Sequence, residues 1–277
     1  MTIVVTGATG PFGHHAVESL LRRGVPADRI VATGRDLDKI KDLDVRAERI
    51  DYADPDSLVR AFTGADKLLF VSGSDAGSRL TQHRNVVDAA TAAGVGFIAY
   101  TSILRADTTD MLLAAEHKAT EQWIVESGVR HTFLRNGWYL ENYDVRTALE
   151  HGLAGSAGDG RISAATRADL ADAAAAALLL DDPKPVYELG GEAFTMTELA
   201  SIMSQVSGRP VSYTDLPEEK YVEMLTGVGV PAPMAAILGD SDRNASRGAL
   251  YVETTDLQSL LGRPVTGTAE AIRAALN

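Results

Sequence analysis

Cysteine is absent from this chain of 277 residues. Disulfide bonds, thiolate zinc sites and cysteine nucleophiles are therefore excluded. A metal site built from histidine and carboxylate side chains remains chemically possible. The adjacent His14 and His15 nevertheless lack a third ligand nearby, and metal sites normally use at least three protein ligands. The sequence predicts no metal centre.

Basic residues are fewer than acidic ones. The chain has 26 Lys and Arg against 38 Asp and Glu, which gives a formal net charge of −12, and its basic residues form no cluster. Surfaces that bind nucleic acid need clustered Lys and Arg side chains. We therefore expect no nucleic-acid partner, and an anionic ligand must be bound by local groups.

Long apolar runs are missing as well. The longest, AAAAALLL at residues 173–180, is bracketed by aspartates and is far shorter than the roughly 20 residues that cross a bilayer. We interpret it as a buried helix and expect no membrane partner. The first residues do not have the basic segment and apolar stretch of a signal peptide. These features predict a cytoplasmic protein.

Short β-branched runs alternate with helix-like runs over the first two-thirds of the chain. This alternation is typical of βαβ units and a parallel sheet. Strands are expected at TIVVT, RIVAT, VRAERI, KLLFVS, GFIAYTS and HTFLRN. After about residue 190 the pattern changes to helices with scattered prolines and one short strand, PVSYT. We predict an α/β fold with a Rossmann-type, doubly wound parallel sheet in residues 1–190 and a smaller C-terminal domain in residues 191–277.

A glycine-rich turn follows the first expected strand and opens the first helix. Its glycines, Gly7, Gly10 and Gly13, have the spacing G-x-x-G-x-x-G, a variant of the dinucleotide-binding fingerprint. Such a turn lets the backbone approach a pyrophosphate and directs helix N–H groups at it. A purely structural turn is the alternative, but the strand before the turn and the βαβ pattern after it favour a dinucleotide site.

The residue after the second strand bears on the choice of dinucleotide. An acid at this position binds the ribose 2′-hydroxyl, whereas an arginine can pair with a 2′-phosphate. This chain has Arg35 there, which favours NADPH, with NADH as the weaker alternative. Asp36 and Asp38 follow directly and oppose a phosphate. An FAD site is less expected, because no acid stands at the strand end.

Four stretches together resemble a known family. They are VVTGATGPFGHHAVESLL, QHRNVVDAATAAGVGFIAYTS, LRNGWYLENY and AGDGRISAATRADLADAAA. They are similar to the NmrA-like branch of the atypical short-chain dehydrogenases/reductases, and within it to the bacterial NADPH:quinone oxidoreductases of the second type and the related triphenylmethane reductases. The resemblance covers almost the whole chain. It implies that the C-terminal α/β domain lies on the substrate side of a cleft, to which residues from about 137 to 160 contribute.

The resemblance also implies a set of site residues. Contacts to the cofactor are expected from the glycine turn, the end of the second strand and two later loops: Gly7, Ala8, Thr9, Gly10, Pro11, Phe12, Gly13, Arg35, Ser72, Gly73, Ser74, Asn136, Gly137, Trp138 and Tyr139. The rings of Trp138, Tyr139 and Tyr143 could form the walls of a substrate pocket. Such rings are also ordinary core or interface residues.

Most short-chain dehydrogenases protonate their product with a Tyr-x-x-x-Lys dyad. The helix after the fifth strand here reads AAEHKATEQW, with His117 and Glu121 at the corresponding spacing. Lys118 is one position off, which turns it about 100° around a helix. Reduction of an aliphatic ketone creates an alkoxide, whereas a quinone gives a phenolate that is about 5–6 pKa units, or about 8 kcal/mol, less basic. The missing dyad therefore favours a quinone-like acceptor that water can protonate later.

Two residues are candidates for catalysis. His117 could protonate the product, although a helix histidine beside Glu116 is more often a surface or packing residue. Ser102 ends the fifth strand, where many dehydrogenases have a hydroxyl near the carbonyl oxygen; a helix cap or turn is the alternative. Arg167 and Asp169 fit a structural pair better than a catalytic one.

These observations predict an oxidoreductase. It is expected to be a flavin-independent, NADPH-dependent reductase that transfers hydride directly to a quinone or a similar conjugated, electron-poor acceptor. The alternative is a non-catalytic NAD(P)-binding redox sensor of the NmrA type. The segment NGWYLENY favours an enzyme, and the absent dyad favours a sensor. The expected partner is a small quinone-like molecule, and the oligomeric state, a homodimer included, stays open.

Overall fold

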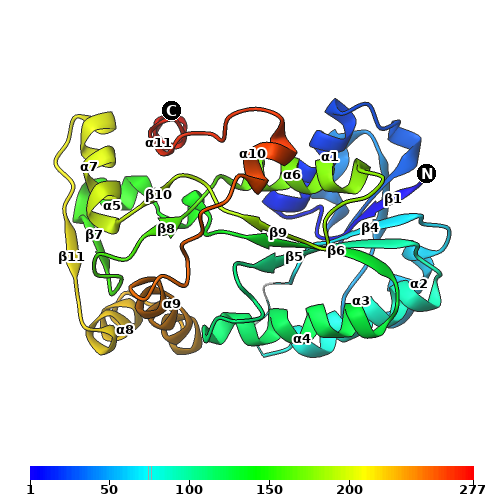
Figure 1. The fold of residues 1–277 in the computed structure, drawn as a ribbon, viewed down its shortest axis with the longest axis horizontal. Helices are drawn as coiled ribbons and strands as arrows, with labels where there is room; N and C mark the ends of the chain where they lie inside the picture. Colours follow the sequence, from blue (N-terminus) through cyan, green and yellow to red (C-terminus); the bar gives the residue numbers. More distant parts are fainter. Residues whose placement is uncertain (74, 76) are drawn as a thin grey trace.

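A parallel sheet forms the centre of the molecule. The computed structural model describes residues 1–73, 75 and 77–277. Its seven-stranded sheet has the order β3-β2-β1-β4-β5-β6-β9, and all neighbouring strands are parallel (Figure 1). The order reverses between β1 and β4, the point where doubly wound sheets bind ligands. The strands are β1 (Ile3–Val5), β2 (Ile30–Gly34), β3 (Arg46–Arg49), β4 (Lys67–Phe70), β5 (Phe97–Ile103), β6 (Arg130–Asn136) and β9 (Val186–Leu189).

The doubly wound sheet confirms the predicted fold class. Each of the six expected strands forms at its predicted place. The seventh, β9, lies at the edge of the sheet beside β6 and was not predicted. Its sequence is only VYEL, with alternate residues buried. Four residues give too short a pattern to separate a strand from its surroundings.

Helices cover both faces of the sheet. On one face α1 (Pro11–Arg22) packs against α6 (Arg167–Leu179), which also contacts α10 (Asp256–Leu261). The other face carries α2 (Pro55–Phe62), α3 (Arg79–Ala92) and α4 (Leu112–Glu126) (Figure 1). Each face has its own buried apolar cluster between the helices and the strands. The result is a three-layer molecule whose central strands are buried on both sides, as expected for a parallel sheet.

The packing of α1 on α6 explains the alanine-rich run. Residues 173–177 are all alanine and all buried. The predicted buried helix is therefore confirmed except at its end, because α6 stops at Leu179 and Leu180 is exposed. Small side chains let the two helix backbones approach closely. A polar contact fixes the same interface, because Ser19 of α1 donates a hydrogen bond to Asp172 and Arg23 Nε lies 2.9 Å from the same carboxylate. The helix that begins at the glycine turn is therefore held in place by α6.

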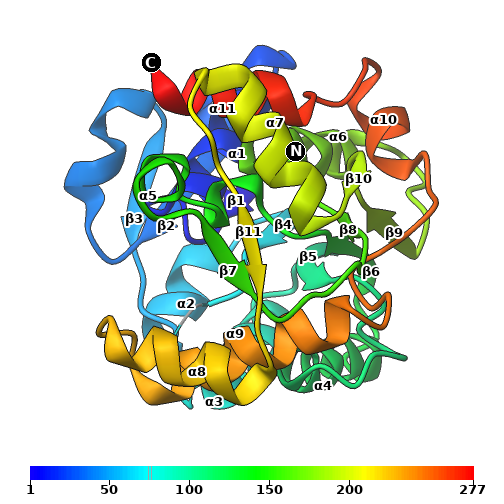
Figure 2. The same ribbon diagram turned by 90° about the vertical axis from the view of Figure 1, so that its left-hand side faces the viewer.

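The remaining elements gather beside the carboxyl ends of the strands. β7 (Leu153–Gly155) pairs in parallel with β11 (Tyr213–Asp215), and β8 (Ile162–Ser163) pairs antiparallel with β10 (Ala193–Phe194) (Figure 2). The predicted strand PVSYT overlaps β11. The helices of this part are α5 (Val145–His151), α7 (Met196–Ser207), α8 (Glu218–Gly227), α9 (Ala232–Ala245) and α11 (Thr268–Leu276).

Segments from both sides of residue 190 meet in this part, since β7 precedes that residue and β11 follows it. In contrast, α10 returns to the large sheet and contacts α6 and β9. The division into domains at about residue 190 stays a prediction. No helix in the described part of the chain is both long enough and apolar enough to span a bilayer.

Candidate active site

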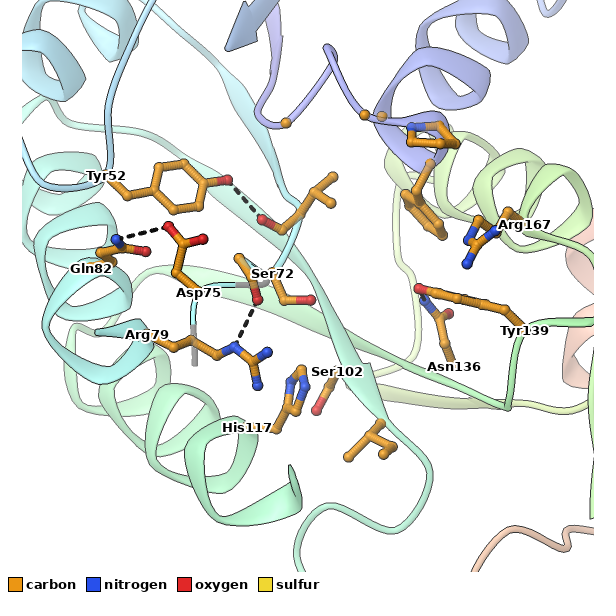
Figure 3. A pocket seen from close by; sticks show the side chains of 18 of the residues that line it. Tyr52, Ser72, Asp75, Arg79, Gln82, Ser102, His117, Asn136, Tyr139 and Arg167 are labelled. Carbon is orange, nitrogen blue, oxygen red and sulfur yellow. Dashed lines mark hydrogen bonds between the residues drawn. The ribbon is translucent and has the colours of Figure 1, made fainter. Parts of the chain in front are cut away.

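A pocket of about 500 Å³ lies along the carboxyl ends of the central strands (Figure 3). Its walls come from the ends of β1, β2, β4, β5 and β6 and from α3, α4 and α6. Ligand pockets in proteins have about 300–1,000 Å³, and open α/β sheets bind ligands at this edge. We describe two regions: the β2–β3 end, which includes Arg35, Asp51, Tyr52, Asp75 and Gln82, and the β5–β6 end, which includes Ser102, His117, Asn136 and Tyr139.

The glycine turn forms the wall between these regions. Gly7 has φ +62°, a conformation that favours glycine. A side chain at Gly13 would collide with the backbone of Gly7 and Ala8. At Gly10 an added Cβ would make one ordinary contact, 3.5 Å from the carbonyl oxygen of Gly7. No described side chain caps the start of α1. The backbone and the helix N-terminus are therefore free to approach an anion.

Most of the predicted turn residues line the pocket: Gly7, Thr9, Gly10, Pro11, Phe12 and Gly13. Ala8 does not. It is fully buried behind the turn, and its N–H donates a hydrogen bond to the carbonyl oxygen of Thr33 at 2.9 Å. The residue therefore ties the turn to β2 and stays behind the ligand-facing surface.

Arg35 lies at the edge of the β2–β3 end. Its side chain is exposed, and its Nη1 lies 3.7 Å from Asp75 Oδ2. The two acids that follow it are engaged locally, because Asp36 accepts a hydrogen bond from the N–H of Asp38 at 3.2 Å and the carboxylate of Asp38 lies 2.8 Å from Lys41 Nζ. The acid that faces the guanidinium is therefore Asp75.

Residues of the turn after β3, of the loop after β4 and of α3 also contribute to this end. The hydroxyl of Tyr52 lies 2.6 Å from Thr6 Oγ1 and 2.7 Å from the carbonyl oxygen of Val71, and Gln82 donates to Asp75 at 3.3 Å (Figure 3). Sequence analysis missed Asp51, Tyr52 and Gln82, since no local motif marks them, whereas Asp75 belongs to the loop at residues 72–78 from which the resemblance implied cofactor contacts. The one available signal was position, because Asp51 and Tyr52 follow a predicted strand.

The loop after β4 is tied to its neighbours. The N–H of Ser72 donates to Thr101 Oγ1 at 2.8 Å, and the N–H of Gly73 donates to His83 Nε2 at 2.9 Å. The carbonyl oxygen of Gly73 accepts from Arg79 Nε at 2.7 Å. Both predicted residues, Ser72 and Gly73, line the pocket. Ser74, the third one, lies outside the described residues.

Ser102 lines the β5–β6 end, but its proton is directed elsewhere. Its Oγ donates to Glu121 Oε1 at 2.6 Å. Arg135 binds the same carboxylate with two donors, Nε at 3.0 Å and Nη2 at 2.7 Å. Arg135 also contacts Asp107 and Glu188. Because this buried carboxylate accepts the hydrogen bond of the Ser102 hydroxyl, the hydroxyl can only accept a hydrogen bond from a ligand.

His117 lies beside Ser102 and is 6% exposed. Its Nδ1 lies 2.8 Å from the hydroxyl oxygen of Tyr100. Burial, reinforced by the positive charge of Arg79, lowers the pKa of His117 to about 3. The imidazole is therefore neutral at physiological pH and does not act as an imidazolium acid. Lys118 is exposed and donates to the carbonyl oxygen of Asp107 at 3.1 Å. It does not line the pocket, as expected from its offset of one position from the dyad spacing.

Asn136 is buried and has one unsatisfied atom. Its Nδ2 donates to the hydroxyl of Tyr139 at 3.4 Å, while its Oδ1 has no partner among residues 1–73, 75 and 77–277. A buried carbonyl oxygen without a partner is costly unless a ligand supplies a donor. Gly137 is next to it and has no room for a side chain, since a Cβ there would collide with the carbonyl oxygen of Ser163. The site fits a ligand amide such as the carboxamide of nicotinamide.

The predicted aromatic residues separate in the structure. Trp138 and Tyr139 line the pocket. Tyr143 does not, because it packs against Phe194 with the ring centroids 6.1 Å apart, in the apolar cluster of the smaller part. Tyr139 is covered on one face by Arg167, whose guanidinium carbon lies 4.9 Å from the ring centroid.

The predicted pair of Arg167 and Asp169 is wrong. Arg167 lines the pocket and donates to Asn142 Oδ1 at 2.9 Å, whereas Asp169 is buried and accepts from Arg263 Nη2 at 2.7 Å. The two residues stand two positions apart in a helix, and such positions point in different directions. Arg263, which comes from the far end of the chain, could not be found as a partner by spacing.

The charges and shapes of the pocket suit a phosphorylated dinucleotide. Among the described lining residues there are three arginines and two aspartates, a larger share of basic residues than in the acidic chain as a whole. The glycine turn admits a pyrophosphate, Arg35 can reach a 2′-phosphate, and Asn136 has an acceptor to satisfy. NADPH has all three complementary groups.

Comparisons with known proteins agree with this geometry. The family described as NAD(P)H-binding matches residues 7–182. Quinone oxidoreductase 2 of Escherichia coli is 46% identical over 99% of both chains. The crystal structure of the E. coli NADPH-dependent quinone oxidoreductase complexed with NADPH has a TM-score of 0.95 at 45% identity and full coverage of both chains. The triphenylmethane reductase of Citrobacter sp. complexed with NADP(H) has a TM-score of 0.92 at 37% identity, covering 99% of this chain and 100% of the other.

Proposed function

This chain belongs to the NAD(P)H-binding family, and on that premise we propose that it is an NADPH-dependent reductase whose acceptor is a quinone or a similar conjugated, electron-poor molecule. NADPH, when bound, supplies the hydride. The enzyme needs neither a flavin nor a metal for this transfer. The acceptor class is supported by the resemblance to quinone oxidoreductase 2 of E. coli.

The observation that carries this proposal is the chemistry of the β5–β6 end. The two positions of the usual proton-donating dyad are occupied by His117 and Glu121. His117 is buried with a pKa of about 3, and Glu121 is bound by Arg135 and Ser102. His117 therefore offers no acid that titrates near neutral pH, and the carboxylate of Glu121 is occupied by its two partners. A reduced quinone is a phenolate, which is weakly basic enough to be released or protonated by water.

The chain's own residues then have separate roles in binding. The glycine turn and the start of α1 bind the pyrophosphate, and Arg35 pairs with the 2′-phosphate. Asn136 accepts a hydrogen bond from the carboxamide and so orients the nicotinamide ring. Tyr139, covered by Arg167, forms an aromatic wall beside it. These assignments rest on the lining and contacts of the pocket.

A spectrophotometric assay of NADPH oxidation tests the function. We expect turnover with benzoquinone and naphthoquinone and none with a simple aliphatic ketone such as cyclohexanone, because the ketone needs an acid that the site does not have. Calorimetric binding of NADPH by the same preparation is the control for an intact site. Binding without quinone turnover above buffer would contradict the enzyme and favour the redox sensor.

A further inference from the structure

A series of buried polar groups connects the loop after β4 to the β5–β6 end of the pocket. The N–H of Gly73 contacts His83 Nε2 at 2.9 Å, and His83 Nδ1 lies 2.9 Å from Thr120 Oγ1. The hydroxyl of Tyr100 lies 3.5 Å from His83 Nδ1 and 2.8 Å from His117 Nδ1. His83, Thr120 and Tyr100 are fully buried. Each contact therefore has to be a donor–acceptor match inside the protein.

The first contact determines the proton position on His83. A backbone N–H can only donate, so His83 Nε2 must accept and carry no proton. Burial, with the charge of Arg79, lowers the pKa of His83 to about 3, so the ring is neutral and its single proton is on Nδ1. That N–H donates to Thr120, whose own hydroxyl donates to the carbonyl oxygen of Glu116 at 2.8 Å.

The same reasoning carries to His117. Because His83 Nδ1 bears a proton, Tyr100 cannot donate to it. Of the two histidine nitrogens beside the Tyr100 hydroxyl, His117 Nδ1 is the nearer, at 2.8 Å against 3.5 Å, and it is the one that can accept. The Nδ1 of His117 then has no proton, and the single proton of the neutral ring is on Nε2. This nitrogen has no hydrogen-bond partner within the described part of the chain, and the side chain lines the pocket beside Ser102 (Figure 3).

We propose that Tyr100 and His83 are positioning residues that hold His117 as its Nε2–H tautomer, so that the pocket offers a neutral N–H donor to the carbonyl oxygen of the acceptor. The identity of that acceptor rests on the proposed function. Ser102 cannot supply this hydrogen bond, since its hydroxyl already donates to Glu121. His117 is therefore a donor that stabilises charge on the acceptor oxygen without transferring a proton.

The charged groups around His117 are paired with one another. On α3 and α4, Arg79 Nη1 lies 2.8 Å from Glu116 Oε2. On α4 and β6, Glu121 Oε2 lies 2.7 Å from Arg135 Nη2. His83, the other titratable neighbour, is itself neutral. No unpaired carboxylate of the described residues faces the imidazole, and the ring therefore keeps one proton and one tautomer through the neutral pH range.

Nitrogen-15 NMR of histidine-labelled protein tests the tautomer directly. We expect His117, identified by the signals lost in His117→Gln, to show a protonated Nε2 and an unprotonated Nδ1 that do not change from pH 5 to pH 8. In Tyr100→Phe the Nδ1 loses its donor, and we expect a mixture of both tautomers. Tyr187→Phe is the matched control, because it deletes a buried hydroxyl that accepts from the N–H of Lys184 and is remote from His117. A protonated Nδ1 in the wild type, or titration within this range, would overturn the proposal.

Quinone kinetics test the role of the donor. A neutral hydrogen bond changes a rate by roughly 2- to 12-fold, so we expect His117→Ala and Tyr100→Phe to lower kcat by that factor. His117→Gln should retain more activity than His117→Ala, since an amide NH₂ can take the place of Nε2–H. Tyr187→Phe should have wild-type kinetics. Equal rates for the Gln and Ala variants would contradict the donor role.

The two proposals fail differently. If the NMR signature is as expected but no quinone is turned over, the proposed function is wrong and the tautomer assignment stands. If quinones are reduced but His117 is protonated on Nδ1, the positioning role of Tyr100 and His83 is wrong and the proposed function stands.

Discussion

At the scale of single residues, Arg35 tests the choice of nucleotide. A guanidinium can make paired, charge-assisted hydrogen bonds to a 2′-phosphate, and NADH has no such anion. Replacement of Arg35 by Ala should therefore weaken NADPH binding by about 1.5–3 kcal/mol, or about 10- to 150-fold, and leave NADH binding nearly unchanged. Titration calorimetry with both nucleotides measures the effect.

Arg60→Ala is the matched control for this change. It removes the same charge from an exposed position on α2 that does not line the pocket. Equal losses for NADPH and NADH in Arg35→Ala would mean that Arg35 supports the loop or the adenine and does not bind the phosphate. The neighbouring Asp75 lies 3.7 Å from the guanidinium, so we expect it to compete with the phosphate and to reduce the wild-type preference for NADPH.

Asn136 gives a second prediction at this scale. Its unsatisfied Oδ1 needs a donor, and the nicotinamide carboxamide is the group that we expect to supply it. Asn136→Ala should lower kcat by a larger factor than it raises the dissociation constant of NADPH. A misoriented nicotinamide ring transfers hydride poorly, whereas the adenosine part of the nucleotide is still bound. The comparison of kcat with the dissociation constant of NADPH decides this. A parallel loss in both, or no loss in kcat, would contradict the orienting role.

At the scale of elements, the buried group around Arg135 joins β5, β6, β9 and α4. The side chain touches Glu121, Glu188 and Asp107, and Ser102 joins it through Glu121. Such a group connects four elements at the edge where the pocket lies. It keeps the β5–β6 end in one arrangement without a ligand.

Removal of the cation should destabilise the fold. Arg135→Leu leaves Glu121 buried with an uncompensated charge, and breaking a buried pair in this way costs about 3–5 kcal/mol. Urea denaturation of the variant measures the loss. The double variant Glu121→Leu with Arg135→Leu should lose less than the single one, because it removes both charges together. A double variant as unstable as the sum of both single variants would show that the pair does not interact.

At the scale of the whole molecule, buried titratable groups set how stability depends on pH. His83 and His117 each have a folded pKa of about 3, lowered by burial, against about 6.5 when unfolded. Between these values the unfolded state binds more protons, so stability falls as the pH drops below 6.5. Asp242 has the opposite sign, because burial raises its folded pKa to about 6 from 3.8, and the folded state then binds more protons.

These opposing effects lead to a testable difference between pH 8 and pH 5. At pH 8 Asp242 is ionised in both states, and its partly exposed carboxylate destabilises the folded one. Asp242→Asn retains an oxygen that can accept from the N–H of Ser156 and should stabilise the protein by about 1–2 kcal/mol at pH 8. At pH 5 the gain should be about half as large, because the folded carboxyl is then protonated while the unfolded one is still ionised. Thermal unfolding at both pH values measures this. A gain of the same size at pH 5 would show that burial of the charge is not the cause.

The sequence by itself determined the parallel sheet and the dinucleotide turn. Alternation of β-branched runs with helical runs is a local pattern, and so is a glycine spacing between a strand and a helix, because both depend on residues near one another in the chain. The predicted strands and the buried alanine helix were confirmed for this reason, and most of the turn residues line the pocket. The absent dyad could also be read directly, since it depends only on spacing within one helix.

Only the tertiary structure decided which distant side chains meet. Asp169 pairs with Arg263, whereas Arg167 lines the pocket. Tyr143 packs against Phe194 outside the pocket. The proton positions on His83 and His117 depend on contacts among β4, α3, β5 and α4. Spacing along the chain cannot give such contacts, because burial and hydrogen bonding between elements depend on how the elements pack. The chemistry of the β5–β6 end therefore follows from the fold. Ser102, His117 and Asn136 were visible in the sequence, but the residues that hold them, Arg135, Tyr100 and His83, were not.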